Sequence, residues 1–442
     1  MTESTENRGG FLFRQVGIAP LVVFRILFGV MMFSATLRFI LKGWVYEQFV
    51  APEHHLKYPF FEWVPDPTEW VIYLLFALLL ISTLFIAIGF LYRIMVITYF
   101  LIFSYVELID ATYYLNHYYF ISLVAGIMIF LPAGRAFSVD VRMGWVNPKS
   151  SVPSYSILSI KGLLALVYFY AGLAKLNPDW ILEALPLRLW LPSQSHLPLV
   201  GKSLDHLWVA YAFSWLGALY DLSIPFLLSS KRTRKWAYLS VIIFHSLTAM
   251  LFQIGMFPWV MIVSTLIFFP EGFHRSILSR LGWKGEGDPF NVNRPSLIQT
   301  TLILFFAFQI LWPWRFLAYP GKLFWTEQGY RLGWRVMLME KAGYITYRVV
   351  DPGTEAEMEV DPSEHLTPVQ VKMLATQPDL ILQYAHFIEQ QMIRNGVDSP
   401  QVYADVHVTL QGHGSRRFVD PNVDLSKEKE GFHHKTWVLP YE

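Results

Sequence analysis

The residue of this sequence best placed to do chemistry is a lysine at the end of an apolar stretch. Lys175 closes the run Tyr168-Phe-Tyr-Ala-Gly-Leu-Ala-Lys175, in which three small residues leave room for a ligand. Surroundings close to hydrocarbon disfavour the charged form of a lysine, which makes a free amine available as a base. A lysine at a helix end can also simply extend to the lipid head groups. Both readings of Lys175 stay open on position alone.

Other polar side chains occur within or at the ends of apolar stretches, where such groups are functional candidates. They are Asn116 and His117 at the start of one stretch, Asp221 within another, and His245 in the middle of a third. A basic lysine needs an orienting partner, and an amide with an imidazole at hydrogen-bonding range would serve. We therefore expect Asn116 and His117 to lie beside Lys175, at the same membrane depth. The alternative is that the histidines simply bond between helices.

Several kinds of site are not predicted. Cysteine is absent, which excludes disulfides and thiolate metal ligands. The pairs His54-His55 and His433-His434 are adjacent in sequence rather than at ligand spacing, so we predict no metal site. The formal net charge of +1 does not suggest a nucleic-acid partner. Arg25 and Arg38, in the first apolar stretch, are interpreted as structural or facing head groups.

Composition predicts an integral membrane protein that uses the lipid bilayer as its solvent. Hydrophobic residues make up 54% of the 442 residues and charged residues only 16%, far more apolar than an ordinary soluble domain. Nine apolar stretches are long enough to be read as spans, the seventh and eighth separated at Gly255 and Pro258. They cover residues 18–41, 69–91, 94–111, 116–133, 156–176, 206–229, 235–254, 256–270 and 298–318.

The loop charges predict how the chain is oriented. Under nine spans, the basic residues fall on one side, which the positive-inside rule makes cytoplasmic. They include Arg14, Arg93, Arg135, Arg142, Lys149, Lys231, Arg232, Arg275, Arg280 and Lys284. The N-terminus is then cytoplasmic and the C-terminal part extracytoplasmic. Eight spans would instead place the C-terminal part in the cytoplasm, so its side depends on the last span.

The last part of the chain has the pattern of a small α+β domain. Alternating strands are predicted at Tyr344–Val350, Ala356–Val360 and Val402–Leu410, with a short partner at Arg416–Val419. A helix is predicted over 367–395. The predicted fold is thus an all-α polytopic membrane domain over 1–320, with about nine transmembrane helices, followed by an extramembrane α+β domain over 321–442.

Short stretches along nearly the whole chain match one known family of membrane enzymes. They are Gly89-Phe-Leu-Tyr-Arg-Ile94, Asn116-His-Tyr118, Phe137-Ser-Val-Asp140, Tyr168-Phe-x-Ala-Gly-x-x-Lys175-Leu-x-x-Asp-Trp180, Asp221-Leu-Ser223, Phe244-His245, Leu251-Phe-Gln-Ile-Gly-Met-Phe257, Ile345-Thr-Tyr-Arg348, Phe418-Val-Asp-Pro-Asn-Val-Asp424 and Thr436-Trp-Val-Leu-Pro440. In this order they resemble the vitamin K-dependent gamma-carboxylase family.

The resemblance implies an activity and assigns residues to it. Members couple epoxidation of vitamin K hydroquinone by O2 to carboxylation of glutamyl side chains with CO2. Lys175 matches the catalytic base, with His117 and Asn116 as further catalytic residues. His245 and Tyr168 are the expected quinol-binding residues. The implied cofactors are vitamin K hydroquinone or a related menaquinol, with O2 and CO2, and the implied partner is a glutamyl peptide or protein.

Departures from the family leave alternatives open. The animal enzymes continue beyond the segment that matches Thr436–Pro440, they carry a disulfide, and they have a histidine that we cannot place in Trp334–Met339. These differences favour a bacterial inner-membrane protein. A quinol epoxidase or oxygenase without protein carboxylation is one alternative, and a non-catalytic membrane scaffold is another. Lys175, Asn116 and His117 argue against the scaffold, because a scaffold has no need of them.

Overall fold

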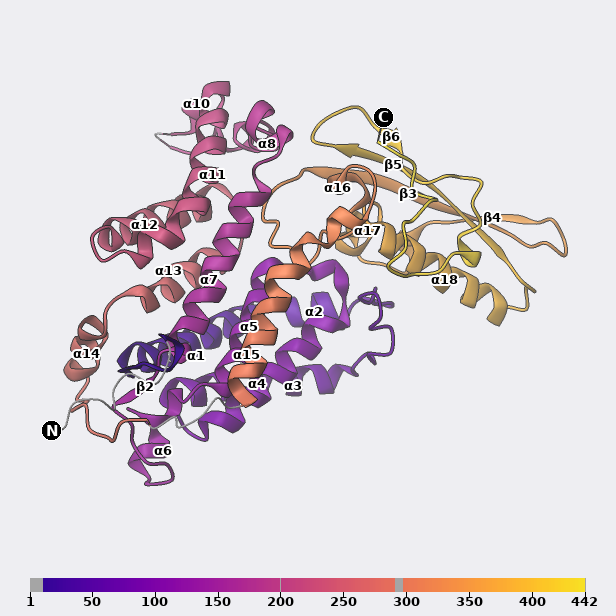
Figure 1. Cartoon of the computed structure of the whole chain (residues 1–442). Coiled ribbons are helices and arrows are strands. Elements are labelled where there is room, and N and C mark those ends of the chain that lie inside the picture. The colour runs from indigo at the N-terminus through magenta and orange to yellow at the C-terminus, as the bar shows by residue number, and fades with distance from the viewer. Residues whose placement is uncertain (1–10, 199, 291–296, 442) are drawn as a thin grey trace.

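The computed structural model describes residues 11–198, 200–290 and 297–441, and it is mostly helical, with a sheet near the C-terminus (Figure 1). Within these residues, six helices are long and apolar enough to cross a membrane. They are α1 (Ala19–Leu41), α3 (Glu69–Ile88), α4 (Tyr92–Ile109), α7 (Tyr155–Ala174), α11 (Leu207–Ser229) and α15 (Leu297–Leu311), which a 3-10 turn (Trp312–Ala318) extends.

The nine predicted spans are not confirmed. The predicted stretches 116–133, 235–254 and 256–270 are not among the six long apolar helices. A crossing helix needs about 20 apolar residues, and α5 (Asn116–Phe130) has only 15. The break at Gly255 and Pro258 is confirmed, since α12 (Arg234–Leu251) ends before it and α13 (Phe257–Ser264) begins after it. However, the α13 segment reaches only Phe268 before a bend of 109° into α14 (Glu271–Arg280). Among the described residues, the structure therefore supports six spans, or seven if this bent pair is one.

The helices form two packed groups. In the first, α1 packs on α3, α3 on α4, and α4 on α5; in the second, α7 packs on α11 and α11 on α12. Gly29 lets α1 approach α3 closely, because a Cβ at this position would lie 2.6 Å from the backbone nitrogen of Ala87. The interpretation of Arg25 as structural is confirmed. Its guanidinium is fully buried and donates to the carbonyl oxygens of Ala133 and Phe137, at 2.9 and 2.6 Å.

A four-stranded antiparallel sheet in the order β4-β3-β5-β6 forms the core of the C-terminal part. Its strands are β3 (Lys341–Val350), β4 (Glu357–Val360), β5 (Gln401–Leu410) and β6 (Arg416–Arg417), close to the predicted positions. The predicted helix is two helices, α17 (Pro368–Leu374) and α18 (Pro378–Arg394), because the helical conformation is interrupted before Pro378. Every second residue of β5 is buried, and α18 packs on this strand.

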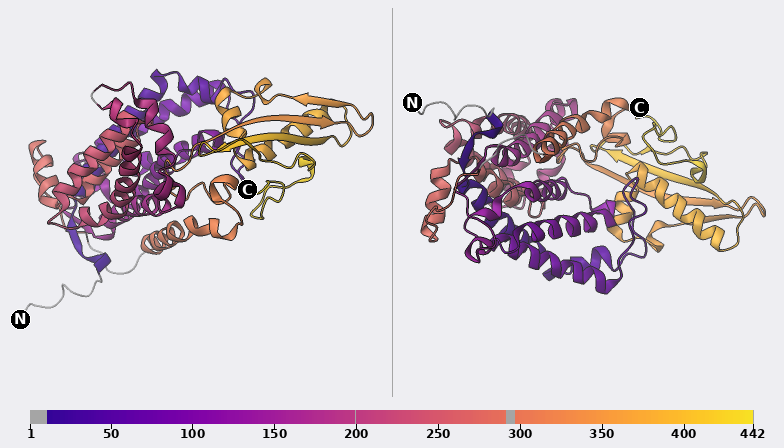
Figure 2. Two further views of the ribbon diagram at one scale, coloured as in Figure 1. Left: turned by 90° about the horizontal axis from the view of Figure 1, so that it is seen from above. Right: turned by 60° about the horizontal axis from the view of Figure 1, so that its bottom comes forward.

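The sheet lies at one end of the helical part, and the two-stranded pair of β1 (Gln15–Gly17) and β2 (Ser151–Pro153) lies at the other (Figure 1). Figure 2 shows the strands extending away from the helices. A buried glutamine joins the two parts: Gln370 Nε2 donates to Asp110 Oδ2 and to the His54 carbonyl oxygen, at 2.7 and 2.8 Å. Burial lowers the pKa of His54 to about 4, so its ring is neutral at pH 7 and stacks on Phe387.

Candidate active site

Lys175 forms a buried ion pair with Asp221. Its Nζ lies 2.6 Å from Asp221 Oδ2, and the two side chains are only 8% and 7% exposed. The ammonium also donates to the Ala171 carbonyl oxygen at 3.3 Å and lies 5.3 Å from the centre of the Trp180 ring. Lys175 therefore does not extend to a membrane surface. Asp221 therefore places a counter-charge beside the lysine Nζ and holds it at a fixed position inside the protein.

Close packing of α7 on α11 brings the pair together. Gly172 lies three residues before Lys175, and a Cβ on it would lie 2.8 Å from the backbone nitrogen of Leu222. Leu222 follows Asp221 directly, so the same contact that needs a glycine places the carboxylate against the lysine. Lys175 itself is the C-cap residue of α7, and its backbone is still in the right-handed helical region.

A tyrosine and a histidine line the same cavity. The Tyr168 hydroxyl lies 2.9 Å from His245 Nε2, and Tyr168 precedes Lys175 by two helical turns on α7. The space between these groups, here called the Lys175 cavity, has a volume of about 90 Å³ and an otherwise largely apolar lining. His245 Nδ1 is buried and has no hydrogen-bond partner among the described residues. The predicted pair of His245 and Tyr168 is thus assembled beside Lys175.

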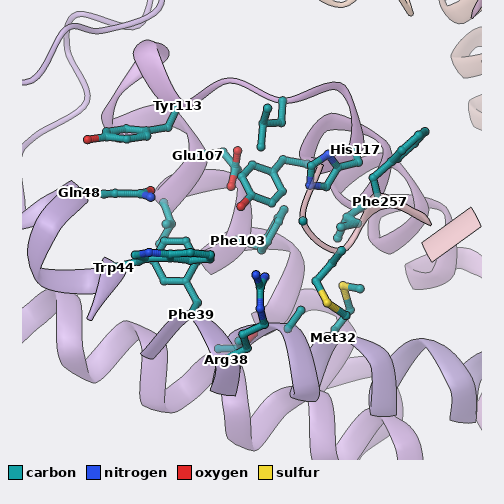
Figure 3. Close-up of a pocket in the computed structure, with 18 of the residues that line it drawn as sticks. Met32, Arg38, Phe39, Trp44, Gln48, Phe103, Glu107, Tyr113, His117 and Phe257 are labelled. Atoms are coloured by element: carbon teal, nitrogen blue, oxygen red, sulfur yellow. The ribbon is translucent and has the colours of Figure 1, made fainter. Parts of the chain in front are cut away.

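His117 lies in a different and larger cavity, of about 420 Å³, here called the His117 cavity (Figure 3). Helices α1, α4 and α5 and the short α2 (Trp44–Phe49) contribute to its walls. The two cavities share four lining residues: Ile254, Phe257, Val336 and Met337. The Phe257 ring lies 5.8 Å from the His117 ring and 5.8 Å from the His245 ring, measured between centres. Phe257 therefore stands between the two histidines.

Asn116 supports one side of this shared wall. Its Nδ2 donates to the Arg335 carbonyl oxygen at 2.8 Å, and its Oδ1 accepts a hydrogen bond from the Tyr114 hydroxyl. The segment it holds has three non-glycine residues in the left-handed region, which is strained backbone of the kind found at functional sites. They are Leu332, Trp334 and Met337, with φ of 58°, 58° and 53°.

The expectation that Asn116 and His117 orient Lys175 directly is wrong. Among the described residues, the hydrogen bonds of Lys175 Nζ go to Asp221 and Ala171. Helix α5 begins on the far side of Phe257, so its polar residues reach the shared wall and not the lysine. Sequence reasoning singled out Asp221 as an intramembrane acid but gave it no role. The missed signal was its charge, because ionisable groups inside membranes usually pair with one another.

Metal-binding groups are not assembled in the described part of the chain. No three histidine, aspartate or glutamate side chains there are grouped so that they could hold an ion. His55 Nδ1 lies 3.3 Å from Asp66, and His434 Nδ1 lies 2.8 Å from Gln328 Oε1. His55 thus pairs within the loop region between α2 and α3, and His434 pairs within the C-terminal part.

Two family models match the chain, and together they cover most of it. Residues 13–273 match the HTTM domain, and residues 294–442 match the lumenal domain of vitamin K-dependent gamma-carboxylase. The first match includes Lys175, Asp221 and His245, and the second includes the C-terminal sheet. No solved structure matches the chain.

Proposed function

The chain belongs to the vitamin K-dependent gamma-carboxylase family, and from this premise we propose that it is a vitamin K-dependent gamma-glutamyl carboxylase. In this proposal it uses vitamin K hydroquinone or a related menaquinol, O2 and CO2, and it acts on glutamyl side chains of a peptide or protein. The observation that carries the proposal is the buried Lys175–Asp221 pair, which lies in a small cavity among apolar helices.

Lys175 is the proposed base. The bound quinol supplies the electrons for the reaction with O2 and is released as its 2,3-epoxide. Lys175 Nζ accepts the proton of a quinol hydroxyl, and Asp221, 2.6 Å away, stabilises the ammonium that results. The ion pair seen in the structure then corresponds to the lysine after proton uptake. The carboxylate has the role of an orienting third group, as in other acid–base sites.

The other candidates act around this pair. Tyr168 and His245 hold each other at 2.9 Å and present one polar contact in an otherwise apolar lining. His117 and Asn116 act from the opposite side of the shared wall, His117 with its ring in the larger cavity and Asn116 by holding the 332–337 segment. Apolar walls keep water from a strongly basic site, which prevents side reactions.

The size of the Lys175 cavity alone does not fit a quinol, whereas the size of the His117 cavity does. Sites for drug-sized molecules have volumes of about 300–1,000 Å³. The Lys175 cavity, at about 90 Å³, is well below this range, and the His117 cavity, at about 420 Å³, is within it. The two cavities share lining residues, so a quinol in the larger cavity would lie next to the cavity of Lys175.

The proposed setting is a bacterial inner membrane, with a catalytic membrane domain over 1–320 and an extracytoplasmic domain over 321–442. The match to a lumenal domain supports the placement of the C-terminal part outside the cytoplasm. In this orientation the glutamyl substrate approaches from the side of the sheet, while the quinol enters from the bilayer.

A coupled assay tests the function. Purified protein in detergent is given vitamin K hydroquinone, labelled bicarbonate and a short glutamyl peptide, and epoxide and fixed label are followed together. Lys175→Ala is expected to lose both products, by about 100-fold or more for a general base, and an added small primary amine is expected to restore part of the epoxide.

The outcomes separate the alternatives. Epoxide without fixed label in the unmodified protein would favour a quinol epoxidase or oxygenase. If the unmodified protein forms neither product, the scaffold is favoured. Full activity of Lys175→Ala would remove Lys175 from the role of base and leave the family activity standing.

A further inference from the structure

Two charged side chains of the His117 cavity have no part in the proposed chemistry. Arg38 comes from the outer half of α1 and Glu107 from the last turn of α4. Figure 3 shows Arg38 rising from α1 into the cavity, with Glu107 and His117 on its other sides. Arg38 was expected to be structural or to face head groups, and the structure places it in this cavity instead.

Neither side chain is paired with a polar group in the described part of the protein. The Arg38 guanidinium lies over the Trp44 ring, 4.8 Å from its centre, and it has no ion pair or hydrogen bond among the described residues. Glu107 likewise has neither in that part of the chain. Charges within apolar helices are costly unless they pair with each other or serve a ligand. Since these two do not pair with each other, a ligand that offers both an acceptor and a donor would satisfy both.

The remaining walls limit the ligand further. Rings surround the cavity, including those of Phe39, Trp44, Phe103 and Phe257. Flat aromatic walls and a volume of about 420 Å³ suit a flat bicyclic ring rather than a flexible chain. A lipid acyl chain offers neither donor nor acceptor, and a glutamyl carboxylate only accepts. A quinol hydroxyl does both, because its oxygen accepts from a guanidinium and its hydrogen is donated to a carboxylate.

We propose that the quinol head group binds in the His117 cavity, with Arg38 donating to a quinol oxygen and Glu107 accepting from a quinol hydroxyl. This inference rests on the proposed function, because the quinol is the cofactor named there. It adds two specificity-determining residues that the sequence reasoning did not assign. The Lys175 cavity then receives only the reacting edge of the ring, across Phe257.

Binding tests the inference without turnover. Tritiated phylloquinone is bound to the full-length protein in detergent, once as the quinone and once as the hydroquinone under nitrogen with excess reductant. Arg38→Met is expected to weaken binding of both forms, by about tenfold for a lost charged hydrogen bond. Glu107→Leu is expected to weaken only the hydroquinone, because the quinone has no hydroxyl to donate.

Matched controls change the same residue types away from the cavity. Arg93→Met, on the exposed opposite end of α4, and Glu69→Leu, at the exposed start of α3, are expected to bind both forms as the unmodified protein does. Arg38→Lys keeps one charged donor and is expected to retain part of the affinity. Thermal melting and gel filtration identify any variant that fails to fold. If Arg38→Met fails to fold, Arg38→Lys takes its place.

The results distinguish failure of the inference from failure of the function. If the unmodified protein binds both forms and neither Arg38→Met nor Glu107→Leu weakens binding, the inference is wrong and the proposed function stands. If Lys175→Ala loses binding while the Arg38 variants keep it, the head group lies in the Lys175 cavity instead. If the unmodified protein binds neither form, the quinol-dependent function fails with the inference.

Discussion

At the scale of single residues, the ion pair between Lys175 and Asp221 is the feature with the clearest chemical consequence. A lysine alone in apolar surroundings gives up its charge, whereas a carboxylate 2.6 Å away favours the ammonium. The carboxylate therefore holds the lysine Nζ in place and provides the counter-charge for its ammonium. Asp221 thus contributes to the reaction through Lys175, as a positioning and charge-stabilising residue.

Substitution of Asp221 tests this role. Asp221→Asn keeps the shape of the side chain but removes the counter-charge, so the rate of epoxide formation is expected to fall by about 100-fold, within the range of general-base effects.

Asp179→Asn is the matched control. Asp179 also pairs with a lysine, Lys322 at 2.9 Å, but it lines neither the Lys175 nor the His117 cavity. This variant is expected to keep the rate. Equal activity of Asp221→Asn and the unmodified protein would show that the counter-charge is not needed.

At the scale of secondary-structure elements, the site depends on how closely α7 and α11 approach. Helix packing distances are set by the side chains at the contact. Gly172 is the residue at that contact, and its neighbour is backbone of α11, which cannot move aside as a side chain can. The helix therefore keeps a residue of poor helix propensity at this position.

Two glycine substitutions on the same helix separate packing from propensity. Alanine favours a helix over glycine by about 1 kcal/mol. A Cβ added at Gly162 would lie 3.3 Å from its nearest neighbour, the Phe306 ring, so Gly162→Ala is expected to be neutral or stabilising. Gly172→Ala is expected to lower the free energy of unfolding by about 1–3 kcal/mol through overpacking, and to slow epoxide formation.

Melting temperature and rate are measured for both variants. A Gly172→Ala protein as stable and as active as Gly162→Ala would show that α11 can yield at this contact, and that the spacing of the two helices does not control the site.

At the scale of the whole molecule, the two ends of the helical part are different. One end has the β1–β2 pair and the other has the four-stranded sheet (Figure 1). If the basic loops are cytoplasmic, the sheet is on the opposite side of the membrane. The Lys175–Asp221 pair, at the end of α7, is then on the extracytoplasmic side, from which the proposed glutamyl substrate approaches.

Reporter fusions test this orientation. Green fluorescent protein fused to the C-terminus is expected to be dark and alkaline phosphatase active, as for an extracytoplasmic end. Fusions in the basic loop after Lys231, between α11 and α12, are expected to give fluorescent green fluorescent protein and inactive alkaline phosphatase. A fluorescent C-terminal fusion would refute the proposed orientation of the sheet.

Much of the architecture is predictable from local pattern. Apolar runs predicted the long helices, and alternation predicted β3 and β5 to within three residues of their observed bounds, because the burial of every second or every third to fourth residue is a local property. The number of spans was less predictable. Phe257–Phe268 and Glu271–Arg280 are long and apolar enough for a span only together, and the local pattern does not predict the bend of 109° between them.

The sequence by itself determined the membrane setting, the α+β end and the residues that could do chemistry, above all Lys175. Only the tertiary structure decided which of them meet. Asp221, 46 positions away, pairs with Lys175, while Asn116 and His117 lie beyond Phe257. Likewise Arg38 and Glu107 share one cavity, although they come from different helices. The physical reason is that hydrophobic pattern places a residue on a face, whereas the partner of that face depends on helix packing across the whole fold.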